Sequence, residues 1–232
     1  MTPTDIRVVD DPAAEVARLL VDVACAGGQI ALSGGSTPQR AYEIASQTDA
    51  DLSAATLWLG DERMVSPADE RSNLRMVRTA LTDRLPEERR PRLMAVDTAL
   101  DPDAAASMYE ELLHDTIGRH PRLDLALMGL GPDGHTASLF PGQAALAESQ
   151  RSVIGVLEAG MEPRVPRVTL TLPLFNHARE VVFLVAGADK AAAVARVFGD
   201  PPDGTAPAAR VRPGAGKLML VLDPPAAVEL RL

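Results

Sequence analysis

One histidine stands in a turn whose composition suits the presentation of a side chain. Residues 129–136 read Gly-Leu-Gly-Pro-Asp-Gly-His-Thr and stand at the end of a predicted strand, 123–129, which is apolar apart from Asp124. An imidazole can accept a proton near neutral pH, so we predict that His135 is a general base. Asp133 either orients this ring or faces it across a pocket. The plain alternative is a tight turn that contains an incidental histidine.

A glycine-rich turn, Ser33-Gly34-Gly35-Ser36-Thr37, follows another predicted strand, 29–33. Glycines let the backbone approach an anion closely, and the N–H groups at the start of a helix favour phosphate. Thr37 is predicted to cap the following helix, and Pro38 suits its first turn. An ordinary capped turn is an equally good interpretation. The glycine spacing fits neither the P-loop nor the dinucleotide-binding fingerprint.

Charged residues follow a third predicted strand, 56–59, where Asp61 and Arg63 come directly after Gly60. These side chains could contact sugar hydroxyls or a carbonyl oxygen. The alternative is a solvated charged loop. Ser72 and Asn73 are predicted to open the next helix.

Lys190 is predicted in the first turn of a helix, after the strand 181–185. The chain has only one other lysine, Lys217. The helix dipole disfavours a cation at this position by about 0.3–1 kcal/mol, and a bound phosphate would reverse that balance. The alternative is an exposed lysine held by Asp189. Arg167 is a possible second cation for the same anion.

The elements that must position these residues alternate between strands and helices, which favours a largely parallel sheet covered on both faces. Apolar spacing over Val16–Val23 predicts a helix that ends at Gly27-Gly28. The other predicted helices are 37–47, 73–85, 103–118 and 191–198, and the other strands are 93–96, 168–172 and 218–222. In such sheets ligands bind beyond the carboxyl ends of the strands. We therefore expect the four groups to share one site.

The fold prediction is an α/β, three-layer αβα arrangement in one domain, 1–232. The segment 200–216 is rich in Pro, Gly and Ala, and is predicted to be a surface loop. The premise of the site is that His135 and Lys190 open into a shared cleft.

Charge and composition exclude several classes of protein. A net charge of −9 is unfavourable for binding nucleic acid or anionic lipid. Cys25 is the only cysteine, which rules out an internal disulfide and a cysteine metal cluster. No His/carboxylate cluster has metal-ligand spacing, so no metal is expected.

The N-terminus lacks the apolar segment of a secretory signal, and no apolar run approaches about 18 residues, the length needed for a membrane-spanning helix. We expect a cytoplasmic protein that does not bind membranes.

Several segments together resemble the glucosamine-6-phosphate isomerase/6-phosphogluconolactonase family. They are Ser-Gly-Gly-Ser-Thr-Pro at 33–38, Gly-Asp-Glu-Arg at 60–63 with Ser-Asn at 72–73, Gly-Leu-Gly-Pro-Asp-Gly-His-Thr-Ala-Ser-Leu-Phe-Pro at 129–141, Arg-Val-Thr-Leu-Thr at 167–171 and Ala-Gly-Ala-Asp-Lys at 186–190. They occur in the family's order, and the block ending in Ser-Leu-Phe-Pro is the most specific.

The resemblance implies a modified Rossmann-like domain and hydrolysis of 6-phospho-D-glucono-1,5-lactone to 6-phospho-D-gluconate in the pentose phosphate pathway, without metal or cofactor. It implies that Asp61, Arg63, Asp133 and His135 form the catalytic group. The loop residues Ser33–Thr37, with Arg167 and Lys190, would hold the 6-phosphate. The partner is then a small phosphorylated sugar lactone, and the protein is expected to be a monomer or a weak homo-oligomer.

Two alternatives remain open at this stage. A glucosamine-6-phosphate deaminase or isomerase would share most of these segments. Deaminases resemble the chain up to the Asp-Gly-His turn but carry a carboxylate where this chain has Phe140, and tend to carry Tyr in place of Arg63. The second alternative, a sugar-phosphate sensor without catalysis, would need a DNA-binding module, for which the sequence offers no spare segment.

Overall fold

The computed structural model describes residues 4–231, and both ends of the predicted domain, 1–3 and 232, lie outside the described residues. The strands are β1 (Thr4–Val8), β2 (Gln29–Leu32), β3 (Thr56–Leu59), β4 (Asp61–Arg63), β5 (Arg92–Met94), β6 (Leu125–Met128), β7 (Val153–Val156), β8 (Arg167–Leu170), β9 (Glu180–Val185) and β10 (Lys217–Leu222). The helices are α1 (Pro12–Cys25), α2 (Ser36–Ala45), α3 (Asn73–Ala80), α4 (Pro102–Ile117), α5 (Leu172–His177), α6 (Ala191–Phe198) and α7 (Pro224–Ala227).

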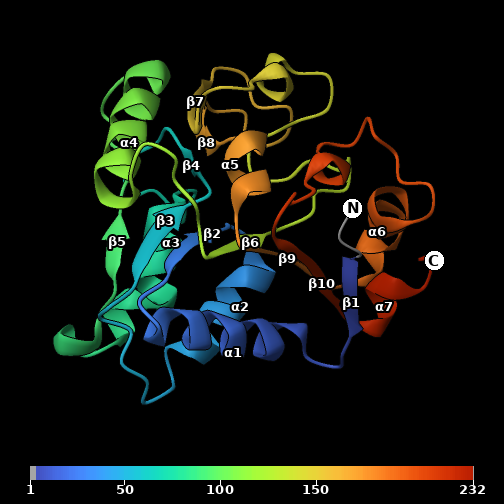
Figure 1. Cartoon of the computed structure of the whole chain (residues 1–232), viewed down its shortest axis with the longest axis horizontal. Coiled ribbons are helices and arrows are strands. Elements are labelled where there is room, and N and C mark those ends of the chain that lie inside the picture. The colour runs from blue at the N-terminus through green and yellow to red at the C-terminus, as the bar shows by residue number, and fades with distance from the viewer. Residues whose placement is uncertain (1–3, 232) are drawn as a thin grey trace.

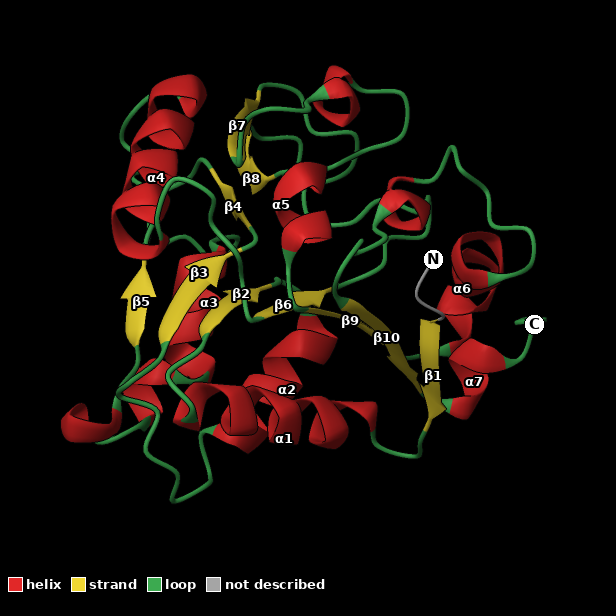
Figure 2. Cartoon of the chain, viewed as in Figure 1, coloured by secondary structure: helices red, strands yellow, loops and turns green. Residues whose placement is uncertain are grey.

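Within residues 4–231, seven parallel strands form the central sheet, in the order β1-β10-β9-β6-β2-β3-β5. Helices lie on both faces: Figures 1 and 2 show α1 and α2 on one side of the sheet, and α4 and α5 on the other. The predicted α/β architecture with a largely parallel sheet is confirmed.

Alternation along the strands divides the apolar side chains between two cores. In β2, Ile30 and Leu32 join the core beneath α1 and α2, while Ala31 faces the core on the opposite side. In β10, Leu218 and Leu220 face that opposite core, and Met219 joins the first. Because both faces are covered, these strands are almost entirely apolar, as parallel strands usually are.

A second, smaller sheet stands beyond the carboxyl end of the first. Its antiparallel strands have the order β4-β8-β7. The predicted strand 168–172 belongs here, and the segment after Gly60 is strand β4, not a charged loop. Gly60 joins the two sheets, because its N–H donates to Leu32 and its carbonyl accepts from Leu170, at 2.8 and 2.9 Å. The small sheet therefore forms a wall over the end of β2 and β3.

The start and end of α1 follow the sequence signals. The Asp11 carboxylate accepts a hydrogen bond from the Ala14 N–H, and Pro12 occupies the first turn. The helix ends before Gly27, which has φ +76°, a conformation suited to glycine. The predicted stop at Gly27-Gly28 is confirmed.

The segment 200–216 is only partly a surface loop. Its first residues are exposed, but Ala206, Ala208 and Val211 are buried, and 207–210 form a 3₁₀ turn. This segment lies against the turn that carries His135, because the Ala208 N–H donates to the Gly134 carbonyl at 3.0 Å. Among residues 4–231, no helix has the length and apolar character needed to cross a bilayer.

Candidate active site

Four neighbouring strands, β9, β6, β2 and β3, end at one cleft. The cleft has a volume of about 240 Å³. Eight of the predicted site residues line it, namely Ser33, Gly34, Gly35, Asp61, Arg63, His135, Arg167 and Lys190. His135 and Lys190 thus open into a shared cleft, as the sequence predicted. Ser36, Thr37 and Asp133 are not among the lining residues.

Asp133 lies behind His135 and orients its ring. The Asp133 Oδ1 atom is 2.5 Å from His135 Nδ1 and also accepts the His135 backbone N–H at 3.0 Å. With Nδ1 engaged by a carboxylate, Nε2 is the ring nitrogen left to act on a ligand. The His135 side chain is 19% exposed, so water can reach it.

The electrostatics of Asp133 follow from this pairing. Burial alone would raise its pKa, but the hydrogen bonds from the backbone and ring of His135 outweigh it, so the pKa is lowered. The carboxylate therefore remains ionised and can stabilise an imidazolium that forms beside it. The His135 ring also lies against Phe140, with centroids 4.8 Å apart.

The glycine-rich turn wraps around the start of α2. Gly35, with φ +110°, precedes the helix as its N-cap residue, and no side chain forms a capping hydrogen bond there. The predicted capping role of Thr37 is therefore wrong: because Gly35 makes the sharp turn, Thr37 already lies inside the first helical turn. Pro38 occupies that turn as expected.

Ser33 has a buried hydroxyl at the wall of the cleft. Its backbone is fixed by Tyr42, whose hydroxyl donates to the Ser33 carbonyl and accepts the Ser33 N–H, at 2.9 and 3.1 Å. Among the described residues, none forms a hydrogen bond with the buried Ser33 Oγ. Because buried polar atoms are normally satisfied, this hydroxyl is suited to a ligand in the cleft.

Asp61 is held by three neighbours at the wall of the cleft. It is 6% exposed; its carboxylate accepts from Ser138 Oγ at 2.6 Å and from Asn73 Nδ2 at 3.0 Å. Arg167 Nη1 lies 3.6 Å from Asp61 Oδ2. Burial lowers the pKa of Arg167, and the nearby Asp61 carboxylate opposes that shift. Arg167 therefore supplies a positive charge from within the wall.

Arg63 and Lys190 are the more accessible cations of the cleft. Arg63 Nη1 donates to the Arg71 carbonyl at 2.6 Å, while its buried Nε has no hydrogen-bond partner among residues 4–231. Lys190 ends a short 3₁₀ turn, Ala188–Lys190, and is the N-cap residue of α6, one position before the predicted first turn. Its Nζ donates to the Leu130 carbonyl at 3.1 Å, on the loop that leads to His135.

Two residues that sequence reasoning did not assign hold these groups in place. Glu62 accepts hydrogen bonds from the backbone N–H groups of Arg63, Asn73 and Leu74, at 2.7, 2.8 and 2.7 Å. Ser138 bonds Asp61, as described above. Both lie inside recognisable motifs, but their partners are distant in sequence. Among residues 4–231, no group of three or more His, Cys, Asp or Glu residues is placed to hold a metal ion.

A family model and individual relatives both match most of the chain. A family model described as glucosamine-6-phosphate isomerases/6-phosphogluconolactonase matches residues 6–220. A 6-phosphogluconolactonase of Nostoc sp. is 39% identical over 207 residues, which cover 87% of this chain and 84% of that protein. The 6-phosphogluconolactonase of Homo sapiens is 36% identical over 205 residues, which cover 85% of this chain and 79% of the relative.

Solved structures of two kinds of enzyme share the fold of this chain. The 6-phosphogluconolactonase of Trypanosoma brucei aligns with a TM-score of 0.84 and 29% identity, with 100% of both chains covered. A monomeric glucosamine-6-phosphate deaminase aligns with a TM-score of 0.77 at 18% identity, covering 97% of this chain and 100% of that one. The second likeness shows a shared fold alone.

Proposed function

Because the chain belongs to the glucosamine-6-phosphate isomerase/6-phosphogluconolactonase family, we infer that it is a lactone hydrolase with 6-phosphogluconolactonase activity. The substrate is 6-phospho-D-glucono-1,5-lactone, and the product is 6-phospho-D-gluconate, an intermediate of the pentose phosphate pathway. The observation that carries this proposal is the single cleft in which the Asp133-oriented His135 faces the same space as Lys190.

We also propose one domain over 1–232, since the two apolar cores lie on opposite faces of one sheet.

In the proposed mechanism, His135 Nε2 removes a proton from a water molecule. The resulting hydroxide adds to the lactone carbonyl carbon, and the carbonyl oxygen becomes an oxyanion. Arg63 or a backbone N–H stabilises that charge. The bond from this carbon to the ring oxygen then breaks, and the ring oxygen receives a proton from the imidazolium or from water. Asp133 stabilises the imidazolium, and Asp61 organises the wall of the cleft.

The 6-phosphate is held away from the reacting carbonyl. We assign it to the loop Ser33–Thr37 with Lys190, and Arg167 adds its charge from the wall. The free Ser33 hydroxyl and the α2 N-terminus support this assignment. Binding of the phosphate would position the carbonyl beside His135, and such positioning can supply much of the rate enhancement.

Phe140 supports hydrolysis over the deaminase alternative. Its ring is 2% exposed and lies beside His135, where it carries no proton for opening a sugar ring or moving hydrogen between carbons. An assay for ammonia from glucosamine 6-phosphate checks this choice directly. Ammonia release at a rate comparable with lactone hydrolysis would contradict it.

The test of the function generates the lactone in situ and follows its loss above the spontaneous rate. We expect His135→Ala to lower kcat by about 10²–10⁴-fold with little change in KM, because it removes the general base. Lys190→Ala should raise KM on the order of 10-fold, the effect of losing one charged hydrogen bond. Lys217→Ala changes the other lysine, exposed at the start of β10, and should match the wild type. Full activity in His135→Ala would contradict the mechanism.

A further inference from the structure

The carboxylate of Asp133 can orient His135 only if the peptide that carries it stays in one orientation. The Asp133–Gly134 peptide lies in a tight turn, in which the Gly134 N–H donates to the Gly131 carbonyl at 3.0 Å. Gly134 has φ +80° and no side chain, so its own backbone does little to resist rotation of this peptide. The turn's own hydrogen bonds include one from the Gly131 N–H to the His135 carbonyl at 2.9 Å, and contacts from other elements add to them.

An arginine of α6 supplies one such contact. Arg196 Nη1 donates to the Asp133 carbonyl at 3.1 Å. The Asp133–Gly134 peptide is thus held at both ends, its oxygen by Arg196 and its N–H by Gly131. The bond from a charged donor is stronger than one from water, so Arg196 restrains the peptide more than solvent would.

Arg196 is itself held in place by Asp203. Its Nε donates to Asp203 Oδ2 at 2.7 Å, and the Arg196 carbonyl accepts the Asp203 N–H at 2.8 Å. Hydrogen bonds from the Thr205 hydroxyl and N–H, and then from Arg196, lower the pKa of Asp203 to about 2. The carboxylate is therefore ionised at neutral pH, and the guanidinium keeps the orientation that reaches Asp133.

The segment after Asp203 holds the next residue of the turn. Ala208 N–H donates to the Gly134 carbonyl at 3.0 Å, and a Cβ on Gly134 would lie 2.7 Å from the Ala206 Cβ. Helix α6, whose N-cap residue is Lys190, also contains Arg196. This helix therefore contacts the turn of His135 directly, through the hydrogen bond from Arg196 to Asp133.

From these contacts we propose that Arg196, oriented by Asp203, is a positioning residue that holds the Asp133 peptide so that its carboxylate orients His135. The inference rests on the proposed lactonase function. Arg196 is not a lining residue of the cleft, so its effect passes through Asp133.

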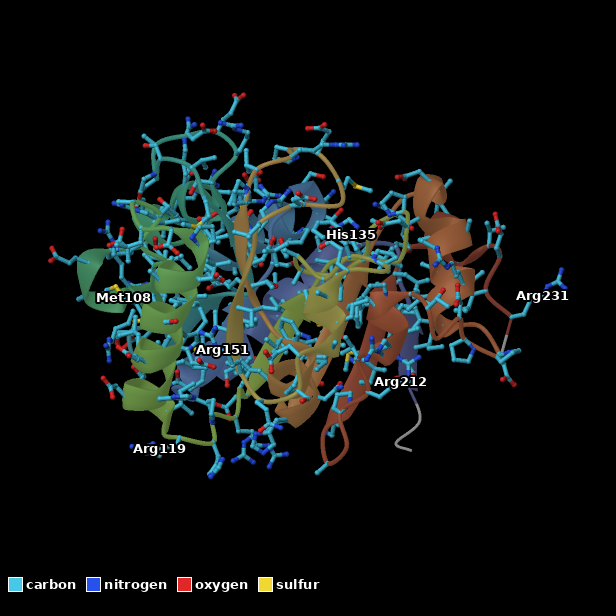
Figure 3. All side chains as sticks on the ribbon, turned by 90° about the horizontal axis from the view of Figure 1, so that it is seen from above. Met108, Arg119, His135, Arg151, Arg212 and Arg231 are labelled. Carbon is cyan, nitrogen blue, oxygen red and sulfur yellow. The ribbon has the colours of Figure 1, made fainter. Side chains whose placement is uncertain are left out.

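Three variants test the role. Arg196→Met keeps an unbranched apolar stem and removes every donor. Arg196→Lys keeps the charge, but a single nitrogen replaces the fork that bonds both Asp203 and Asp133. Arg212→Met is the matched control, because Arg212 also bonds α6, at the Val197 carbonyl (3.3 Å), but has no bond to the turn. Arg212 and His135 lie well apart in the view from above (Figure 3).

Steady-state kinetics with the lactone give the first readout. We expect Arg196→Met to lower kcat about 10- to 100-fold, the scale expected when a catalytic group is misplaced, with KM within about twofold of wild type. Arg196→Lys should recover part of the loss, and Arg212→Met should stay within about twofold of wild type. A raised KM with unchanged kcat, or equal kcat in the Arg196→Met and Arg212→Met variants, would overturn the proposal.

The second readout is independent of turnover. The proton between His135 Nδ1 and Asp133 should give a downfield NMR signal, assigned by its loss in His135→Ala. Arg196→Met should broaden it or shift it upfield, and Arg212→Met should not. An unchanged signal in Arg196→Met overturns the inference. If the wild type lacks lactonase activity, the function fails and this signal still decides the positioning role. If Arg196→Met does not fold, the same signal is compared between the wild type and the variants Arg196→Lys and Asp203→Asn.

Discussion

At the scale of single residues, Gly131 creates the space that the His135 ring occupies. A Cβ at position 131 would overlap Nδ1 and Cε1 of that ring. The contact involves the side of the imidazole that bonds Asp133, so a ring displaced by such a Cβ would lose that bond. The glycine is therefore required by the position of the histidine as well as by the turn.

Gly131→Ala is expected to displace the imidazole and lower kcat on the order of 10²-fold or more, since the base would lose both its orientation and its place. Crowding of this kind typically costs about 1–3 kcal/mol of stability, so thermal unfolding should be followed alongside kinetics. Gly204→Ala is the control, because a Cβ there meets no atom within 4 Å. Unchanged kcat in Gly131→Ala would show that the ring occupies another position.

At the scale of elements, Glu62 fastens strand β4 to helix α3. Its side chain is buried, and it accepts hydrogen bonds from three backbone N–H groups and from the Ser72 hydroxyl at 3.0 Å. Burial raises the pKa of Glu62, and the four hydrogen bonds oppose that shift. Through this junction α3 keeps Asn73 on Asp61, and β4 keeps Arg63 at the cleft.

Glu62→Ala should destabilise the fold by about 2–4 kcal/mol, because it leaves several buried donors unsatisfied. For a chain of this size that corresponds to a fall in Tm on the order of 10 °C. Glu148→Ala is a matched control: Glu148 also accepts three backbone N–H groups, but it is only partly buried, so water can replace it more readily than it can replace Glu62. Equal losses of Tm in the two variants would contradict the role of burial.

The strands that an apolar run predicts best are those buried on both faces of the central sheet. Strands β2, β3, β6, β9 and β10 fall in this class. Strand β4 could not be predicted from Asp-Glu-Arg, since only its pairing with β8 makes it a strand. The helix predicted over 73–85 ends at Ala80, and a 3₁₀ turn over Thr82–Arg84 follows it. The prediction was too long because Leu81 and Leu85 are buried and extend the helical apolar spacing past the end of the helix.

The site was predictable where its chemistry lies within one local turn. Asp133 and His135 are two residues apart, and Ser72 caps α3 by accepting the Arg75 N–H, as its place before the helix suggests. The bond from Ser138 to Asp61 spans 77 positions, and that from Arg196 to Asp133 spans 63. Such pairings depend on how sheets and helices pack, which a single sequence does not specify.

For the whole molecule, the carboxyl pKa values that are lowered outnumber the raised one, that of Glu62, and they make the fold less stable in acid. Asp203 titrates at about 2 in the folded protein, against an ordinary value of 3.8. Between these values the unfolded chain binds more protons than the folded one, so stability increases with pH. The contribution is present above about pH 4 and is lost as pH falls through 3.8 toward 2. The pKa values of Asp133, Glu15 and Glu148 are shifted in the same direction.

We therefore expect urea unfolding midpoints to fall as pH is lowered from about 5 to 3. Asp203→Asn should make that fall shallower, because its carboxyl no longer titrates, while lowering the midpoint at pH 7, where the ion pair with Arg196 is lost. Asp22→Asn, at an exposed ion pair on α1, is the comparison. A midpoint that rises on acidification would contradict the expected sign.

The order of strands also has a consequence for biosynthesis. Strand β1 pairs only with β10 in the described sheet, and β10 in turn pairs with β9. During translation the first strand must therefore wait, with its edge unpaired, until residues 217–222 have left the ribosome. At roughly 5–20 residues per second, that wait lasts on the order of 10–40 s. The nascent chain can assemble β2, β3, β5 and β6 in this interval, but the β1 edge of the sheet closes last.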